Sequence, residues 1–178
     1  MVLILLGAAT AFADAAYDRY RQPEKLVAAL GLARGQRVAD VGAGGGYLTV
    51  RLAAAVGPEG RVVATDIDDK ALEVLRGRVA KLPNVVVRKV APDEPGLEAA
   101  SFDLILLAEV DQYLPDRVAY FRKLRGALAP RGRIAVTNRN RFRDPVVAAG
   151  AAAGYTVSGE MNEIPAQFLL FLVPRDAR

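Results

Sequence analysis

Five residues between positions 40 and 66 have the types and the spacing of a nucleotide-binding turn. Asp40 ends a short β-branched run and is followed at once by Gly42, Gly44 and Gly46, and then by a helix-compatible segment. Asp66 closes a second strand-like run 26 positions after Asp40, where such units carry a ribose-binding carboxylate. A strand, a glycine turn and a helix in this order let the backbone approach a nucleotide-like ligand at the helix N-terminus.

The spacing of these glycines separates two classes of ligand. A dinucleotide-binding turn reads G-x-G-x-x-G. Here the order is G-x-G-x-G, and Tyr47 occupies the position of the third dinucleotide glycine. This disfavours a nucleotide-dependent oxidoreductase and favours a ligand without a pyrophosphate.

The sequence contains neither cysteine nor histidine. Disulfides, thiol nucleophiles and cysteine-ligated metal centres are therefore excluded, and so is a Ser-His-Asp triad. Proton transfer must use carboxylates, tyrosine, lysine or water. We expect no metal site.

Length and composition predict one domain with a sizeable core, since the 178 residues are 52% hydrophobic. The formal net charge is +4, and the densest basic stretch contains Arg131, Arg133, Arg139, Arg141 and Arg143. We interpret this stretch as a solvated loop. An anionic substrate, nucleic acid or a membrane surface is the alternative partner for it.

The N-terminus has the pattern of a targeting segment. Residues 2–13 are almost wholly apolar, and Ala11-Phe12-Ala13 before Asp14 fits a signal-peptidase site. We therefore expect a signal peptide at 1–13, a mature domain at 14–178, and a periplasmic or secreted protein. The alternative is a cytoplasmic protein in which this segment is a mis-set start or a helix packed on the domain. No later run is long enough to span a bilayer.

Beyond position 14 the chain alternates between helix-like and strand-like segments, which predicts a single doubly wound α/β sheet of the Rossmann-like type. The last two strands form a hairpin, so the sheet is expected to be mostly parallel with an antiparallel C-terminal strand. The expected helices are 23–30, 47–56, 68–81, 115–128 and 144–153. The expected strands are 36–41, 61–66, 85–89, 102–108, 133–137, 155–161 and 168–173.

Four motifs in the right order resemble those of class I S-adenosylmethionine-dependent methyltransferases. They are D-x-G-x-G-x-G at 40–46, S-F-D before an apolar strand at 101–106, L-x-x-x-L-x-P-x-G at 124–132, and an A-G-F-like signature at 149–155. Arg131 replaces one glycine of the third motif. Within that class the chain looks most like small methyltransferase-domain proteins with an export signal, which carry a Pro-Asp-Asp-Pro-like loop (here 92–95) and a Leu-Pro-x-Gln-like tail (here 164–169).

This resemblance implies S-adenosylmethionine as the cofactor and a small-molecule methyl acceptor, with no strong sign of nucleic acid. The backbone of Gly42, Ala43, Gly44 and Gly46 would approach the methionine and ribose portions of the cofactor. Asp40 would orient the turn or meet the amino group.

Four further residues are implied on the nucleoside side. Asp66 would accept hydrogen bonds from both ribose hydroxyls, which suits a carboxylate. Ile67 would pack on the adenine face. Asp93 or Glu94 would contact the adenine amino group, with a solvated turn as the alternative reading.

The segment after the fourth strand is expected to face the transferred methyl group. Many relatives carry a histidine here, whereas this chain offers Glu109, Asp111 and Tyr113 as a catalytic base or a substrate handle. Glu109 is also counted among the cofactor contacts. Methyl transfer depends mainly on positioning the reacting groups, so the missing histidine is compatible with activity. A non-catalytic ligand-binding protein on a methyltransferase scaffold is the alternative function.

Overall fold

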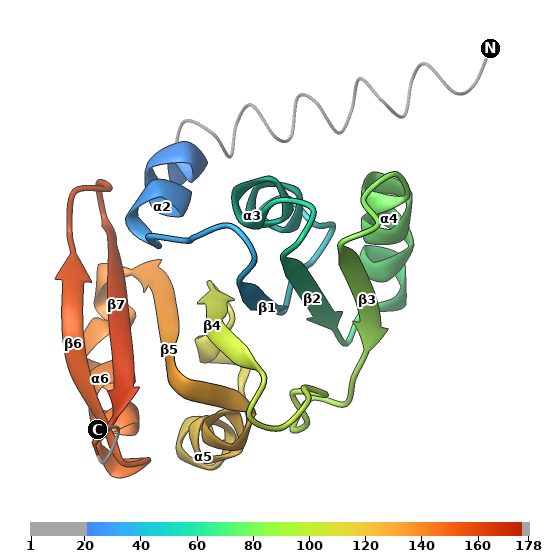
Figure 1. Ribbon diagram of the computed structural model, residues 1–178. Coiled ribbons are helices and arrows are strands. Elements are labelled where there is room, and N and C mark those ends of the chain that lie inside the picture. The colour runs from blue at the N-terminus through green and yellow to red at the C-terminus, as the bar shows by residue number, and fades with distance from the viewer. Residues whose placement is uncertain (1–20, 176–178) are drawn as a thin grey trace.

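The computed structural model describes residues 21–175, and a seven-stranded sheet forms its centre (Figure 1). The strand order is β3-β2-β1-β4-β5-β7-β6. The strands are β1 (Arg37–Val41), β2 (Arg61–Asp66), β3 (Val85–Lys89), β4 (Phe102–Ala108), β5 (Leu128–Arg139), β6 (Tyr155–Met161) and β7 (Gln167–Pro174).

The sheet is parallel from β3 through β5 and antiparallel at the C-terminal hairpin. β1 pairs with β2 and β4, and β2 with β3 and β4 with β5, all in parallel. β7 lies between β5 and β6 and runs antiparallel to both. The predicted doubly wound sheet with an antiparallel C-terminal strand is confirmed.

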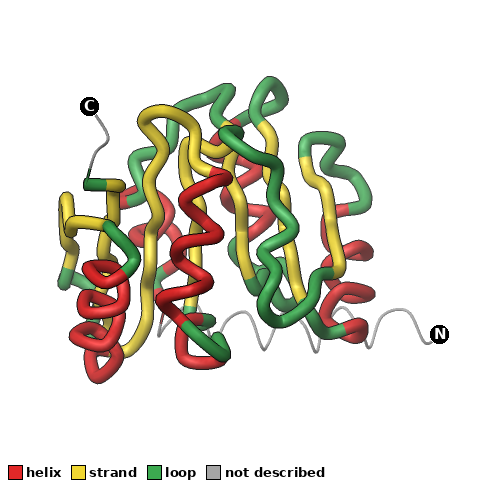
Figure 2. Tube along the Cα trace, turned by 90° about the horizontal axis from the view of Figure 1, so that it is seen from below, coloured by secondary structure: helices red, strands yellow, loops and turns green. Residues whose placement is uncertain are grey.

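Helices cover both faces of the sheet, as the ribbon and tube views show (Figures 1 and 2). One face carries α2 (Pro23–Ala29), α3 (Thr49–Val56) and α4 (Asp69–Val79), and the other carries α5 (Arg117–Ala127) and α6 (Arg143–Ala152). No helix connects β3 to β4; a loop spans residues 90–101 instead.

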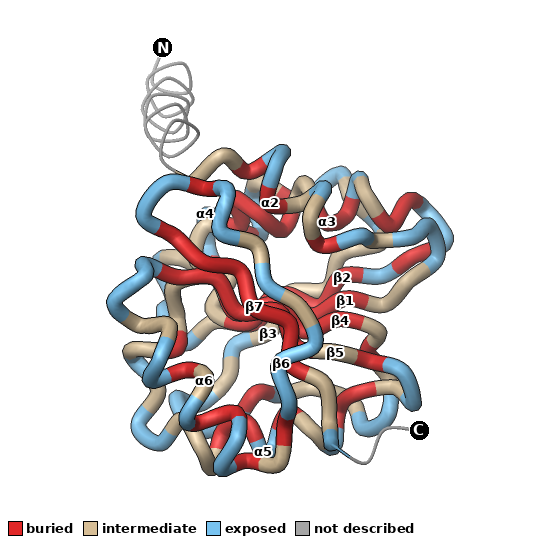
Figure 3. Tube along the Cα trace, turned by 90° about the vertical axis from the view of Figure 1, so that its left-hand side faces the viewer, coloured by how far each residue is buried: buried red, intermediate tan, exposed pale blue. Residues whose placement is uncertain are grey.

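The apolar sequence of β4 explains why both faces are covered. Successive side chains of a strand point to opposite faces. Leu104 and Leu106 pack against α2 and α3, whereas Ile105 and Leu107 pack against α5 and α6, and all four are almost fully buried. The central strands are therefore buried on both sides (Figure 3), as the continuous apolar run predicts.

Most elements begin or end within a few residues of the prediction. Two of the boundaries that differ have a visible structural reason. β5 begins at Leu128, directly after α5, because this residue already pairs with Phe102 before a register shift. Gly132 lies in that irregular stretch, where a Cβ atom would come within 2.3 Å of the Phe102 carbonyl oxygen. α5 begins at Arg117 because the Asp116 side chain accepts a hydrogen bond from the backbone N–H of Ala119 at 3.0 Å.

The expected signal peptide lies outside the described residues, so export stays a prediction. Within residues 21–175 no helix is both long enough and apolar enough to cross a membrane.

Candidate functional site

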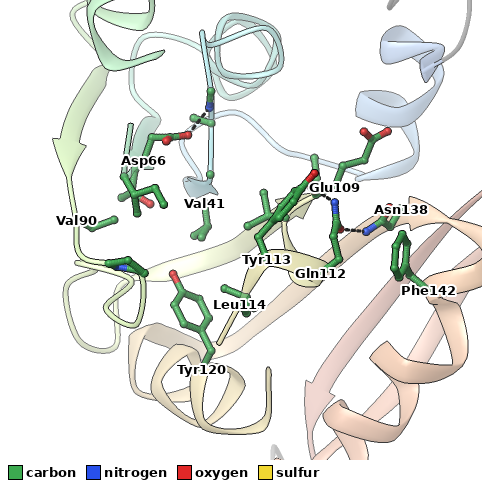
Figure 4. A pocket seen from close by; sticks show the side chains of 18 of the residues that line it. Val41, Asp66, Val90, Glu109, Gln112, Tyr113, Leu114, Tyr120, Asn138 and Phe142 are labelled. Atoms are coloured by element: carbon green, nitrogen blue, oxygen red, sulfur yellow. Dashed lines mark hydrogen bonds between the residues drawn. The ribbon is translucent and has the colours of Figure 1, made fainter. Parts of the chain in front are cut away.

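A cavity of about 780 Å³ opens at the carboxyl ends of β1, β2, β4 and β5. This is where the strand order reverses, with β1 flanked by β2 on one side and β4 on the other. Ligands of open α/β sheets bind at such a switch point. The glycine turn and Asp66 form one end, and Gln112, Asn138 and Phe142 lie at the other (Figure 4).

Glycine occupies the three spaced positions of the turn for different structural reasons. All have positive φ angles, of +69° at Gly42, +54° at Gly44 and +82° at Gly46, which favour glycine. A Cβ atom on Gly42 would lie 2.4 Å from the side chain of Val110, and one on Gly46 would lie 2.4 Å from Leu75. A Cβ atom on Gly44 would meet no atom within 4 Å. Gly42 and Gly46 are thus required by packing, whereas Gly44 borders open space in the cavity.

Asp66 is held in place by the backbone of this turn. One carboxylate oxygen accepts a hydrogen bond from the Gly44 N–H at 2.7 Å, and the other accepts one from the Asp68 N–H at 2.9 Å. Each oxygen keeps a further lone pair, and Asp66 lines the cavity. The carboxylate is therefore pre-oriented to accept hydrogen bonds from a ligand.

Asp40 lies beneath the turn and does not line the cavity. It is 2% exposed, and the Thr49 hydroxyl donates a hydrogen bond to its carboxylate at 2.6 Å. Burial raises the pKa of Asp40 to about 6; the Thr49 hydrogen bond lowers this pKa, and the charge of Asp66 raises it. Asp40 consequently supports the turn from behind, and its position matches the predicted orienting role better than direct contact with a ligand.

A mostly apolar wall extends from the turn on the β2 and β3 side. It includes Ile67, which is 54% exposed, and the segment 90–92. Asp93 does not line the cavity, since its carboxylate lies 3.7 Å from Lys123 Nζ, and Glu94 pairs with the same lysine. These contacts correspond to the solvated turn that was the alternative reading for this acidic pair.

Tyr120 also lines this wall, although sequence reasoning missed it (Figure 4). It lies on the inner side of α5 next to Phe121, and both are nearly buried. Burial, together with the charges of Glu94 and Asp93, raises the pKa of Tyr120 to about 12, so its hydroxyl stays protonated. The sequence signal of Tyr120 equals that of a core residue on an amphipathic helix, which is why it was not found.

Glu109 occupies a strained position at the end of β4. Its φ angle is +56°, which is uncommon for a residue with a side chain and is typical of functional sites. Arg21 donates a hydrogen bond to Oε2 at 2.7 Å. Oε1 is buried and has no hydrogen-bond partner among the described residues. Glu109 therefore brings an acceptor oxygen to the cavity wall that the protein leaves unsatisfied.

The other two predicted catalytic residues are separated by the structure. Tyr113 is 78% exposed and lines the cavity. Asp111 is fully buried behind the cavity wall, where its carboxylate accepts hydrogen bonds from Asn138 at 2.6 Å and Arg117 at 3.1 Å. Glu109 and Tyr113 are thus brought to the cavity together, whereas Asp111 holds the fold of the segment.

Asn138 and Gln112 are functional candidates that the sequence did not reveal. Asn138, at the end of β5, donates hydrogen bonds to both Asp111 and Gln112. Gln112 in turn donates to the backbone carbonyl of Glu109 at 2.8 Å. This chain of hydrogen bonds fixes the segment after β4 against β5, and so positions Glu109.

Comparisons with known proteins agree with this fold. A family model described as a methyltransferase domain matches residues 39–134, more than half of the chain. The chain is 27% identical over 123 residues to the demethylmenaquinone methyltransferase of Staphylococcus aureus, covering 69% of this chain and 51% of the relative. It spans about half the length of the curated relatives it matches.

Solved structures share the fold. A SAM-dependent methyltransferase from Aquifex aeolicus aligns with a TM-score of 0.82 and 23% identity, over 88% of this chain and 91% of that chain. The ribosomal protein L11 methylase from Lactobacillus delbrueckii subsp. bulgaricus aligns with a TM-score of 0.71 and 19% identity, over 88% and 79%. With the family model matching from β1 into β5, the chain belongs to the methyltransferase domain family.

Proposed function

We propose that this protein binds S-adenosylmethionine and transfers its methyl group to a small-molecule acceptor. One observation carries the proposal: of the three spaced glycines, Gly44 alone has an open Cβ position, and its N–H holds the Asp66 carboxylate at the cavity wall. A bare backbone next to a pre-oriented carboxylate suits a ligand with vicinal hydroxyls. The names of the similar proteins support S-adenosylmethionine as that ligand.

The residues present fit this cofactor. Asp66 would accept hydrogen bonds from the ribose hydroxyls, and Gly44 leaves room for the ligand beside the turn. Ile67 and the segment 90–92 offer an apolar wall for the adenine. Tyr120 adds a neutral hydroxyl to that wall and would make the polar contact that the resemblance assigned to Asp93 or Glu94.

When bound, S-adenosylmethionine supplies a methyl group activated by its positively charged sulfur. The chain's own contribution is to position the acceptor and accept its proton. Glu109 suits this role because its buried Oε1 lacks a hydrogen-bond partner among the described residues, whereas Arg21 holds Oε2. A carboxylate in this position can replace the histidine that many relatives carry there.

The proposal that the acceptor is a small molecule rests on the site and not on the similar proteins. The similar proteins named above act on demethylmenaquinone or on a ribosomal protein, according to their names, so the family by itself selects no acceptor. The cavity of about 780 Å³ is within the usual size range of small-molecule sites.

Cofactor binding is tested by calorimetric titration with S-adenosylmethionine and S-adenosylhomocysteine. Asp66→Asn is expected to weaken binding about tenfold to hundredfold, because charge-assisted hydrogen bonds to the ribose are lost. Asp69→Asn is the matched control, since Asp69 is an exposed carboxylate that pairs with Lys89 outside the cavity. The proposal would be contradicted if the wild-type protein bound neither S-adenosylmethionine nor S-adenosylhomocysteine.

Methyl transfer is tested separately by incubating the protein with labelled S-adenosylmethionine and candidate acceptors. Glu109→Gln is expected to lower the turnover rate much more than the cofactor affinity. Tight cofactor binding without transfer to any acceptor would instead favour the non-catalytic ligand-binding alternative.

A further inference from the structure

The five arginines of the basic stretch 131–143 are divided by the structure into two groups. Arg133 donates to the Leu30 carbonyl and stacks on Phe171 with a distance of 4.3 Å between its guanidinium carbon and the ring centroid. Arg143 forms two hydrogen bonds of 2.7 Å with the Glu160 carboxylate. Arg131 is exposed near the start of β5, at the opposite end of the strand from the cavity. None of these three lines the cavity.

Arg139 and Arg141 form the second group, and both line the cavity. They follow Asn138 at the carboxyl end of β5, where the Asn138 side chain accepts a hydrogen bond from the Arg139 N–H at 2.8 Å. Neither guanidinium pairs with a carboxylate within the described part of the chain. Arg141 lies over the Phe142 ring at 4.7 Å, a stacking that leaves the in-plane N–H groups of a guanidinium available.

The carboxylates that line the cavity do not neutralise these two arginines. Glu109 already pairs with Arg21. Asp66 lies at the opposite end, held by the glycine turn. The end of the cavity near Phe142 therefore has two arginines without a carboxylate partner among residues 21–175, next to the Phe142 ring. The exposed Tyr113 lines the same cavity.

We propose that the methyl acceptor carries an anionic oxygen group, a carboxylate or a phosphate, which Arg139 and Arg141 bind. The body of the acceptor packs against Phe142 and Tyr113, with its nucleophile directed to Glu109. This inference rests on the proposed function and names the substrate class of the same site. Two arginines at one cavity suit a small anion, because nucleic acid is bound along an extended basic stripe.

The test uses probes of matched shape. The protein is titrated at low salt with 4-hydroxybenzoate, its neutral analogue 4-hydroxybenzamide, and inorganic phosphate, while backbone amide NMR shifts are recorded. We expect saturable shifts around residues 139–142 with at least one of the two anions. The amide is expected to bind about tenfold more weakly than the acid, which is the effect of losing a charge-assisted interaction. Saturation by phosphate alone would indicate a phosphorylated acceptor, and saturation by the benzoate alone a carboxylic acid.

Substitutions distinguish anion binding at Arg139 and Arg141 from attraction by the overall positive charge of the protein. Arg139→Gln with Arg141→Gln is expected to weaken anion binding about tenfold or more. Arg131→Gln is the matched control and is expected to bind as the wild type does. All three side chains are exposed, so the substitutions are expected to change stability little. The comparison of acid with amide needs no variant.

Three results would overturn the proposal: no saturable binding of either anion, saturable binding of acid and amide with equal affinity, or unchanged anion binding in the double variant. S-adenosylhomocysteine binding tests the proposed function separately. It is expected to be the same in the double variant and the wild type, and its absence from the wild type would contradict the proposed function itself. Loss of anion binding with retained S-adenosylhomocysteine binding therefore addresses the acceptor site alone.

Discussion

Substitution of Asp40 by asparagine is expected to stabilise the folded protein at neutral and alkaline pH. The Asp40 carboxylate is buried, and its pKa in the folded protein is raised to about 6 from the ordinary value of 3.8. Ionised Asp40 therefore destabilises the folded state. Asparagine at this position keeps an oxygen that accepts the Thr49 hydroxyl and carries no charge.

The size and the sign of the effect follow from the two pKa values. Because the folded-state pKa lies above that of the unfolded chain, the folded state binds more protons between them. Stability from Asp40 is thus fully present below about pH 4 and is lost as the pH rises through about 6. The difference of the two pKa values corresponds to about 3 kcal/mol. About 2 kcal/mol of this is expected to develop between about pH 4.5 and pH 8.

The assay is urea unfolding of the wild type and of Asp40→Asn at a series of pH values. The stability difference between the two proteins is expected to grow in favour of the variant by about 2 kcal/mol from about pH 4.5 to pH 8. Comparing the difference, not the absolute stability, removes the titration of all other groups. A change in stability that the asparagine amide causes equally at every pH does not affect how this difference varies with pH.

Thr49→Val provides the internal control. The Thr49 hydroxyl stabilises the ionised carboxylate, so its loss is expected to cost more at pH 8 than at acidic pH. The same substitution made in the Asp40→Asn protein is expected to have a cost that does not vary with pH. A wild-type to Asp40→Asn difference that is constant across the pH range would refute the reasoning, as it would show that burial does not raise the Asp40 pKa.

Three further substitutions test packing, capping and positioning. Gly46→Ala is expected to destabilise the protein by about 1–3 kcal/mol in thermal unfolding, because φ is +82° and the new Cβ would lie 2.4 Å from Leu75; an unchanged melting temperature would contradict this. Asp68→Ala is expected to cost about 1 kcal/mol by the same measurement, because its side chain accepts a hydrogen bond from the Ala71 N–H at the start of α4. Asn138→Ala is expected to cost about 1–3 kcal/mol and to increase hydrogen exchange in the segment after β4; unchanged exchange there would argue against the positioning role.

The elements around the glycine turn were predictable because they depend on local structure. Positive φ angles at Gly42, Gly44 and Gly46 follow from the chemistry of a tight strand-to-helix turn. Asp66 was identified by its place at the end of a strand-like run, and the structure brings it within hydrogen-bond distance of Gly44. The continuous apolar run of β4 predicted a central parallel strand, and the sheet order confirms it.

The different tasks of the three glycines were not predictable. Their sequence spacing is regular, but Gly42 meets Val110 and Gly46 meets Leu75, which belong to segments far away along the chain. Only the folded sheet and its covering helix show that Gly44 is the one of the three whose Cβ position is open.

The end of the cavity near Phe142 likewise depended on tertiary structure. The sequence by itself determined the alternation of strands and helices, the glycine turn and the carboxylate that follows β2, because hydrophobic period and backbone conformation are properties of neighbouring residues. The pairing of Arg21 with Glu109, 88 positions apart, joins the residues before α2 to the end of β4. The pairing of Asn138 with Asp111, 27 positions apart, was decided by the order β1-β4-β5 in the sheet. That order brings chain segments together that no local pattern connects, and it also decides which arginines of a basic stretch meet a cavity and which stabilise the fold.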